Sequence, residues 1–166
     1  MRFTRFIALA ASVALSACAT KAPKQLPPEP GTSTSTEQTG NGAPTPGSQA
    51  DFVARMMGKD TIYFDTDKYN IDYADAAALT AQAQWLTQYP TKRATIEGHC
   101  DERGTREYNL ALGERRANAA KDYLVSLGVA PERLSTVSYG KERPVALGSD
   151  EASWAKNRRA VTVTID

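Results

Sequence analysis

Residues 98–105 form an acidic loop bounded by glycines, and a segment that carries arginines follows it. The loop reads Gly-His-Cys-Asp-Glu-Arg-Gly-Thr, and Arg116 lies about three helical turns beyond its end. A carboxylate such as that of Asp101 binds an ammonium group, and an arginine can grip a carboxylate through two parallel hydrogen bonds. The residue types and their spacing therefore predict a groove that binds a zwitterionic ligand between Asp101 and Arg116.

Two regular elements are expected to position these side chains. Residues 94–99 have the pattern of a strand that leads into the loop. Thr105 or a neighbour then opens a long helix, in which Leu112, Ala120 and Leu124 recur in i+4 register. Gly128 closes this helix as a left-handed cap. The strand thus places Asp101 at one side of the predicted groove, and the helix places Arg116 at the other.

The other segments alternate between strand and helix patterns. Asp72 is expected to cap a helix that has Asp75 in its first turn and ends before Pro90. The remaining elements are strands at residues 61–64 and 134–139, a short helix at 149–154 and a last strand at 160–165. The sum is an α+β domain of the order β-α-β-α-β-(α)-β. We expect its helices to pack on one face of a mixed four-stranded sheet.

The last strand alternates between valine or isoleucine and threonine. Val161, Val163 and Ile165 share one face, because successive side chains of a strand point to opposite sides. The apolar residues are expected to point inward. The threonines are then expected on the outer face.

The first seventeen residues have the pattern of a secretory signal. Two positive charges precede an apolar run at residues 6–15, which is too short to span a bilayer. The run ends in Leu-Ser-Ala-Cys, so the segment resembles a bacterial lipoprotein signal that is cleaved before Cys18, whose thiol and amine are then acylated. An ordinary signal peptide with an incidental cysteine is the alternative. Residue 19 is Ala rather than the Asp of inner-membrane retention, which favours the outer membrane.

Residues 18–50 have the composition of a tether. They contain six of the nine prolines, and Leu26 is their one large aliphatic residue, so they bury too little apolar surface to fold. A globular composition begins at about residue 51 and continues to 166. The net charge of +1 gives no reason to expect a nucleic-acid partner.

The loop and the following helix carry a dense motif that runs from Gly98 to Ala117. It reads Gly-x-x-Asp-x-x-Gly-Thr-x-x-x-Asn-x-x-Leu-Gly-x-x-Arg-Ala, with every defined position filled. This motif resembles the peptidoglycan-binding motif of OmpA-like domains, as found in peptidoglycan-associated lipoproteins. Residues 62–69, 139–144 and 156–161 resemble the same family. The resemblance covers nearly all of residues 58–166.

The resemblance implies that the domain binds peptidoglycan through the meso-diaminopimelate of its peptide stem. Carried over by position, Asp101 and Arg116 hold the amine and the carboxylate of that residue. Phe64 and Asp65 are implied to form the opposite wall. Phe64 can equally be an ordinary core residue, since aromatic side chains at strand ends often are.

Asn109 and Leu112 are implied to shape the floor of the site and to orient the loop. The family resemblance also implies a protein partner, the periplasmic propeller protein of the Tol system (TolB). Arg115, Arg158 and Arg159 are expected to be solvated or structural rather than ligand-binding. No cofactor and no metal site are expected.

The sequence patterns that would indicate an enzyme are weaker than the binding motif. His99 and Cys100 are neighbours in an extended segment, so their side chains point to opposite sides and are poorly placed to pair. With Cys18 lipidated, Cys100 has no partner for a disulfide and is expected to be a small buried residue. Carboxylates such as Asp67 and Glu102 can in principle act as a glycosidase pair. A structural lipoprotein with protein partners alone is the third possibility.

Overall fold

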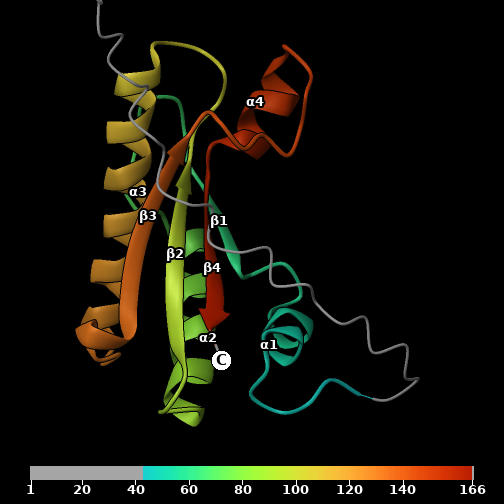
Figure 1. The fold of residues 1–166 in the computed structure, drawn as a ribbon, viewed down its shortest axis with the longest axis vertical. Helices are drawn as coiled ribbons and strands as arrows, with labels where there is room; N and C mark the ends of the chain where they lie inside the picture. The colour runs from blue at the N-terminus through green and yellow to red at the C-terminus, as the bar shows by residue number, and fades with distance from the viewer. Residues whose placement is uncertain (1–42, 166) are drawn as a thin grey trace, which may run out of the picture. The chain divides into compact units, whose positions relative to one another are not determined.

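Four strands form one mixed sheet in the computed structural model, which describes residues 43–165. Their order across the sheet is β1 (Thr61–Tyr63), β4 (Arg159–Ile165), β2 (Arg93–His99) and β3 (Leu134–Gly140). Strand β4 runs antiparallel to both β1 and β2, whereas β2 and β3 are parallel. The predicted mixed four-stranded sheet of an α+β domain is confirmed (Figure 1).

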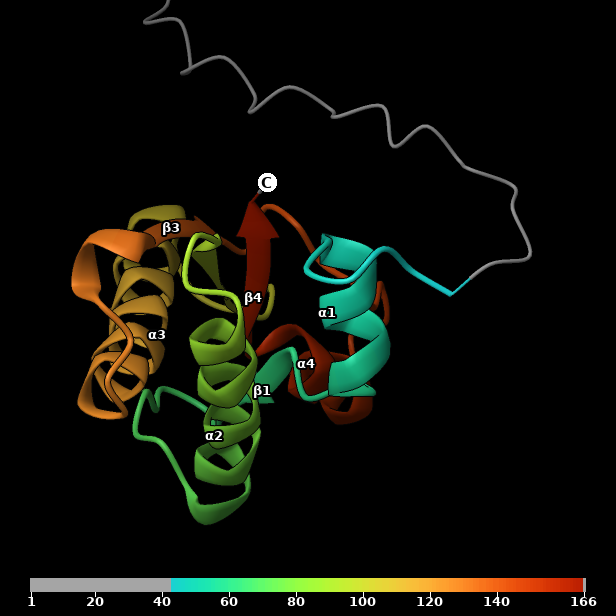
Figure 2. The same ribbon diagram turned by 90° about the horizontal axis from the view of Figure 1, so that it is seen from below.

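Two long helices cover one face of this sheet. Helices α2 (Tyr73–Gln88) and α3 (Arg106–Ser126) lie side by side beneath the strands, as Figure 2 shows. The short helix α4 (Glu151–Asn157) lies at the end of the sheet where β2 and β3 finish (Figure 1). No helix within residues 43–165 is long and apolar enough to cross a membrane.

A further helix, α1 (Gln49–Met56), was not predicted. It packs against α2 and β4 and begins ahead of the domain start expected at residue 51. Its N-cap is Ser48, whose side chain accepts a hydrogen bond from the backbone N–H of Asp51. Cys18 and the tether up to residue 42 lie outside the described residues.

The predicted helix boundaries rest on side-chain caps that the structure contains. Asp72 accepts a hydrogen bond from the N–H of Asp75 at 2.8 Å, and Thr105 accepts one from the N–H of Tyr108 at 3.2 Å. Each cap satisfies a backbone donor that the first helical turn leaves without a partner. Gly128 has a φ of 94°, a left-handed conformation that suits glycine at the end of a helix.

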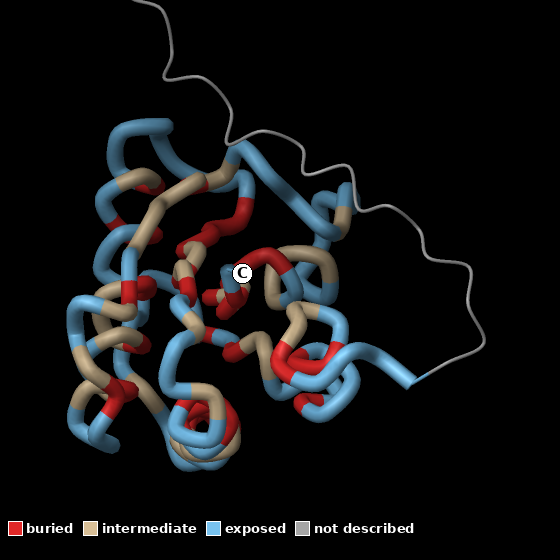
Figure 3. Tube along the Cα trace, turned by 60° about the horizontal axis from the view of Figure 1, so that its bottom comes forward, coloured by how far each residue is buried: buried red, intermediate tan, exposed pale blue. Residues whose placement is uncertain are grey.

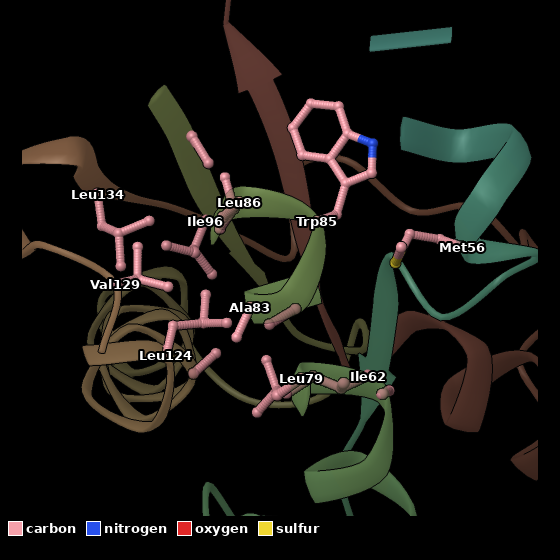
Figure 4. Packing of buried hydrophobic residues seen from close by; sticks show 14 of the residues in the cluster. Met56, Ile62, Leu79, Ala83, Trp85, Leu86, Ile96, Leu124, Val129 and Leu134 are labelled. Atoms are coloured by element: carbon pink, nitrogen blue, oxygen red, sulfur yellow. The ribbon is translucent and has the colours of Figure 1, made fainter. Parts of the chain in front are cut away.

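The hydrophobic core lies between the two long helices and the sheet. Leu79 and Leu86 of α2 meet Ile96 of β2 and Leu124 of α3, all of them fully buried (Figure 4). Coloured by burial, the chain is buried along the sides of helices and strands that face one another and exposed on the outer turns (Figure 3). A core of this kind stabilises the domain through the apolar area that it removes from water.

The predicted orientation of β4 is wrong. Thr162 and Thr164 are buried, whereas Val161 and Val163 are half-buried and Ile165 is exposed. The alternation of the sequence correctly showed which residues share a face. It could not show which of the two faces the helices cover.

Polar side chains from the helices explain why threonines face inward. The hydroxyl of Thr162 donates a 2.7 Å hydrogen bond to Oε1 of Gln82 in α2. The backbone N–H of Thr164 donates to Oε1 of Gln49 in α1, also at 2.7 Å. Because buried polar groups are stable only when hydrogen-bonded, these glutamines make threonine suitable for the helix-covered face.

Helix α3 approaches the sheet very closely at one point. A Cβ atom on Gly98 would lie 1.8 Å from the carbonyl oxygen of Gly113, and one on Gly113 would lie 2.4 Å from Oγ of Ser138. Only glycine allows this separation, because any side chain would overlap backbone atoms. The two glycines therefore fix the distance between β2 and the first half of α3, which is the half that carries the motif.

Candidate functional site

A cavity of about 300 Å³ lies beyond the end of β2, next to the start of α3. Most of its wall comes from the loop after β1 and, far along the sequence, from the loop after β2 together with the first half of α3, which follows that loop directly. Its lining residues are Thr66, Asp67, Cys100, Asp101, Arg103, Gly104, Tyr108, Asn109, Leu112, Arg116 and Arg158. Four of the predicted site residues are thus brought together: Asp101, Asn109, Leu112 and Arg116.

Asp101 lies in the wall of this cavity with its carboxylate already paired. Arg103 donates to it through its backbone N–H and Nε, both at 3.1 Å, and through Nη2 at 2.6 Å. Arg158 adds a longer contact of 3.4 Å from Nη1. Burial raises the pKa of Asp101, but the hydrogen bonds from the two arginines outweigh it and hold this pKa below its ordinary value. The carboxylate is therefore ionised at neutral pH.

Arg116 is fully buried and is held by backbone carbonyls rather than by an acid. Its Nε donates to the carbonyl of Lys68 at 2.9 Å, and its Nη2 donates to that of Asp65 at 3.1 Å. Nη1 donates to the carbonyl of His99 at 2.8 Å and approaches Sγ of Cys100 at 3.4 Å. Arg116 thus fastens the loop after β1 to the end of β2.

These contacts leave Arg116 little capacity for a ligand. A guanidinium group has five N–H donors, and the four hydrogen bonds of Arg116 occupy four of them. Within the described part of the chain, one N–H of Nη2 has no acceptor. Arg116 was predicted to bind a ligand carboxylate through two hydrogen bonds. With the loop after β1 in this position, it can donate only one.

Asn109 holds the acidic loop in place. Its Nδ2 donates to the carbonyl of Arg103 at 2.7 Å and to that of Thr105 at 3.0 Å. Leu112 is buried one turn later and contributes apolar surface to the cavity. This geometry agrees with the orienting role predicted for Asn109, and ligand contact by either residue stays a prediction.

The opposite wall of the cavity differs from the one predicted. Thr66 and Asp67 line it, and the Tyr108 hydroxyl donates to Asp67 across the opening at 3.2 Å. Phe64 and Asp65 instead line a neighbouring cavity of about 240 Å³. The Phe64 ring is buried, and its centroid lies 5.1 Å from the guanidinium carbon of Arg116. Phe64 therefore supports Arg116 from behind the cavity.

Two arginines that the sequence reasoning left out belong to this site. Arg103 was not considered, and Arg158 was grouped with solvated or structural residues. Arg158 is buried, and besides its contact with Asp101 it donates to the carbonyl of Phe64 at 2.9 Å. Arg159 is buried too, whereas Arg115 is exposed. Two consecutive arginines where β4 begins were the available signal, because successive side chains of an extended segment point to opposite sides and one of the two then points into the protein.

The neighbours His99 and Cys100 do not form a nucleophile and base pair. Sγ of Cys100 donates to the carbonyl of Asn109 at 3.3 Å, whereas the His99 ring packs against Tyr139 and lies 3.5 Å from the carboxylate of Glu97. Burial raises the pKa of the Cys100 thiol to about 11, so the thiol is protonated at neutral pH. Cys100 is the small buried residue that the sequence predicted.

Comparison with known proteins gives consistent results. The family model described as the OmpA family matches residues 63–158. The peptidoglycan-associated lipoprotein of Rhizobium meliloti (strain 1021) is 54% identical over 157 residues, which cover 95% of this chain and 85% of the relative. The crystal structure of the peptidoglycan-associated lipoprotein from Burkholderia pseudomallei matches with a TM-score of 0.66 and 46% identity, covering 71% of this chain and 100% of that one.

A more distant structure shows the same fold. The C-terminal domain of Helicobacter pylori MotB matches with a TM-score of 0.60 at 21% identity, covering 64% of this chain and 84% of that one. At this identity, the likeness concerns the arrangement of helices and strands alone.

Proposed function

The chain belongs to the peptidoglycan-associated lipoproteins of the OmpA family, and from this premise we propose that it binds peptidoglycan without a covalent bond. The ligand is the meso-diaminopimelate of the peptide stem, whose free end carries an ammonium and a carboxylate. The observation that carries this proposal is the cavity itself, which places the carboxylates of Asp67 and Asp101 next to the guanidinium of Arg116. Opposite charges around one cavity suit a zwitterion.

Each charged group of the ligand then has a defined partner. The ammonium pairs with Asp101, which is ionised, and Asp67 lies on the facing wall. The carboxylate takes the remaining N–H of Arg116. We assign the opposite wall to Thr66 and Asp67, in place of Phe64 and Asp65, whose contribution is to hold Arg116 from behind.

The membrane end of the chain completes the proposed function. Acylation of Cys18 anchors the protein in the outer membrane, the tether spans part of the periplasm, and the domain that begins with α1 binds the wall. In this role the protein links the outer membrane to the cell wall as part of the Tol-Pal system, with TolB as its periplasmic partner. These assignments rest on membership of the family.

Titration calorimetry of the full-length protein in detergent with a stem peptide that contains meso-diaminopimelate tests the proposal. Charge-assisted hydrogen bonds contribute about 1.5–3 kcal/mol each, and the loss of translational and side-chain freedom offsets several kcal/mol. We therefore expect a Kd of roughly micromolar or weaker for one peptide. Asp101→Ala is expected to weaken binding at least about tenfold, because the ligand ammonium loses its counter-ion in a buried site.

The exposed Arg115 provides the matched control. Arg115→Ala changes a neighbour of Arg116 that is absent from the cavity lining, so binding is expected to stay near that of the parent. Sedimentation with purified sacculi separates wall binding from a purely protein-binding role, and release of soluble fragments would indicate a hydrolase. If the parent protein binds neither stem peptide nor sacculi, the proposed function is wrong.

A further inference from the structure

Arg103 forms the main contacts of the Asp101 carboxylate. Its Nε and Nη2 meet the two carboxylate oxygens at 3.1 and 2.6 Å, which is the two-pronged geometry that an external cation would have to replace. Its Nη2 also donates to the hydroxyl of Thr66 on the facing wall at 3.2 Å. The Arg103 side chain therefore spans the cavity and fills the position expected for the ligand ammonium.

The Arg103 side chain is less confined than the other arginines of the site. It is 39% exposed, whereas the Arg158 side chain is 7% exposed and Arg116 is fully buried. Its guanidinium carbon lies 4.3 Å from the centroid of the Trp154 ring in α4, a cation–π contact that does not depend on Asp101. Arg103 can thus give up Asp101 and still be held beside the cavity by Trp154 and Thr66.

The charge of the lining favours a ligand that brings its own carboxylate. The lining residues include three guanidinium groups, from Arg103, Arg116 and Arg158, against two carboxylates, from Asp67 and Asp101. Glu151 pairs with Arg158 at 2.6 Å and balances the third guanidinium, so a plain ammonium that enters this cavity displaces Arg103 from its partner and leaves one positive charge without a counter-ion. A zwitterionic head adds no net charge, and its carboxylate can receive the displaced guanidinium.

We propose that Arg103 makes this site selective for a zwitterionic head over a plain ammonium, because its guanidinium pairs with Asp101 and passes to the ligand carboxylate when the ligand ammonium pairs with Asp101. This inference rests on the proposed function and extends it, because it names the residue that rejects the wrong ligand. Arg116 supplies one N–H to the carboxylate, and Arg103 supplies the two-pronged contact that Arg116 cannot make. Specificity then comes from a cost imposed on the wrong ligand as well as from contacts to the right one.

Two stem peptides that differ in one group test this assignment. The tripeptide L-Ala-γ-D-Glu-meso-diaminopimelate carries an ammonium and a carboxylate at its free end. The same tripeptide with L-lysine as its third residue keeps the ammonium and lacks that carboxylate. Calorimetry of the full-length protein in detergent gives the Kd of each, and the ratio of the two is the selectivity.

The parent protein is expected to prefer the diaminopimelate peptide by at least about tenfold. Arg103→Gln should weaken binding of that peptide and leave binding of the lysine peptide equal or stronger, so that the ratio falls by about tenfold or more. Arg106→Gln is the matched control, because Arg106 pairs with Glu142 at the surface and is absent from the cavity lining. Arg103→Lys, which keeps the charge without the two-pronged contact, should show an intermediate ratio.

Two outcomes would overturn this role for Arg103. If Arg103→Gln left both Kd values unchanged, Arg103 would not contact the ligand carboxylate. An equal loss for both peptides would show that Arg103 merely holds Asp101 in place. Failure of the parent protein to bind either peptide would instead overturn the proposed function on which the inference rests. If Arg103→Gln proves unfolded by circular dichroism, the ratio measured for Arg103→Lys decides between these outcomes.

Discussion

Replacing Arg116 by alanine is expected to destabilise the domain strongly, apart from any effect on ligand binding. The change removes a fully buried guanidinium and leaves the carbonyls of Asp65, Lys68 and His99 without their donor. A buried polar group without a partner costs about 1–3 kcal/mol. Only the carbonyl of His99 belongs to a buried residue, and water can satisfy those of the exposed Asp65 and Lys68 in part. Removal of the arginine also relieves its own desolvation cost, which lowers the sum further. The free energy of unfolding should therefore fall by about 3–5 kcal/mol.

Urea denaturation followed by circular dichroism measures this change. A domain of this size has a denaturant dependence of about 1–3 kcal/mol per molar urea, so the midpoint should move by about 2 M. Arg116→Lys should fall between alanine and the parent, because one ammonium can satisfy only some of the three carbonyls. The effect is large against a typical stability of about 5–15 kcal/mol.

The adjacent Arg115→Ala variant is the control for this measurement. Arg115 is exposed, and its guanidinium carbon lies 6.0 Å from the centroid of the Tyr69 ring. Loss of this side chain should therefore change the unfolding free energy by less than about 0.5 kcal/mol. If Arg116→Ala moved the midpoint no further than Arg115→Ala does, the carbonyl contacts would not stabilise the domain. In that case a loss of binding in Arg116→Ala could be assigned to ligand contact alone.

Three further predictions concern the cysteines and the acidic loop. Cys18→Ala should abolish fractionation with the outer membrane, because acyl chains contribute about 0.8 kcal/mol per buried CH₂ and no other anchor is expected; retention after high-salt and carbonate washing would contradict this. The Cys100 thiol should resist iodoacetamide at pH 8 in the folded protein and react in urea, because its pKa is about 11 in the fold; mass spectrometry of the modified protein checks it, and equal rates in both conditions would count against it. Because Asp101 has a lowered pKa in the fold, it stabilises the protein at neutral pH, and this contribution is lost as the pH falls below its ordinary value of 3.8. Asp101→Asn should therefore reduce the fall in the urea midpoint between pH 6 and pH 3, and an acid dependence equal to that of the parent would refute the assignment.

The sequence was most informative where local chemistry decides the structure. Asp72, Thr105 and Gly128 marked helix ends correctly, because caps and left-handed glycines act over a few residues. The missed helix α1 had a signal of the same kind, since Ser48 is followed three residues later by Asp51, an arrangement close to a capping box. Attention to this pair would have placed the start of the domain before residue 51.

The burial of Arg116 was also visible in the sequence. Leu112, Ala120 and Leu124 were recognised as one buried row of a helix, and Arg116 occupies the missing i+4 position in that row. A charged residue in such a row must find hydrogen-bond partners inside the protein. The row would have predicted a structural role for Arg116, which was not recognised from the sequence, beside the ligand contact proposed for it.

The opposite wall of the cavity could not be predicted from periodicity. Strand β1 ends at Tyr63, and the loop that follows it turns through Asp67, which has a left-handed φ of 56°. A single left-handed residue redirects the side chains of a loop, and no repeat in the sequence reports it. Asp67 lines the cavity, whereas Phe64 and Asp65, which precede this turn, line the neighbouring one. The buried face of β4 escaped prediction for a related reason, since it depends on helices that are distant in the sequence.

The arginine contacts to the loop after β1 have a mechanical consequence. In the proposed role, tension from the membrane enters the domain through α1 and β1 and leaves it through the ligand. Strand β1 has only three residues and, within residues 43–165, pairs with β4 alone, so few backbone hydrogen bonds hold it in the sheet. Arg116 and Arg158 hold the carbonyls of residues 64, 65 and 68 directly beyond this strand. These hydrogen bonds transmit the force to α3 and to the start of β4. The residues that shape the proposed binding site therefore also hold the loop after β1 in the fold when the chain is under tension.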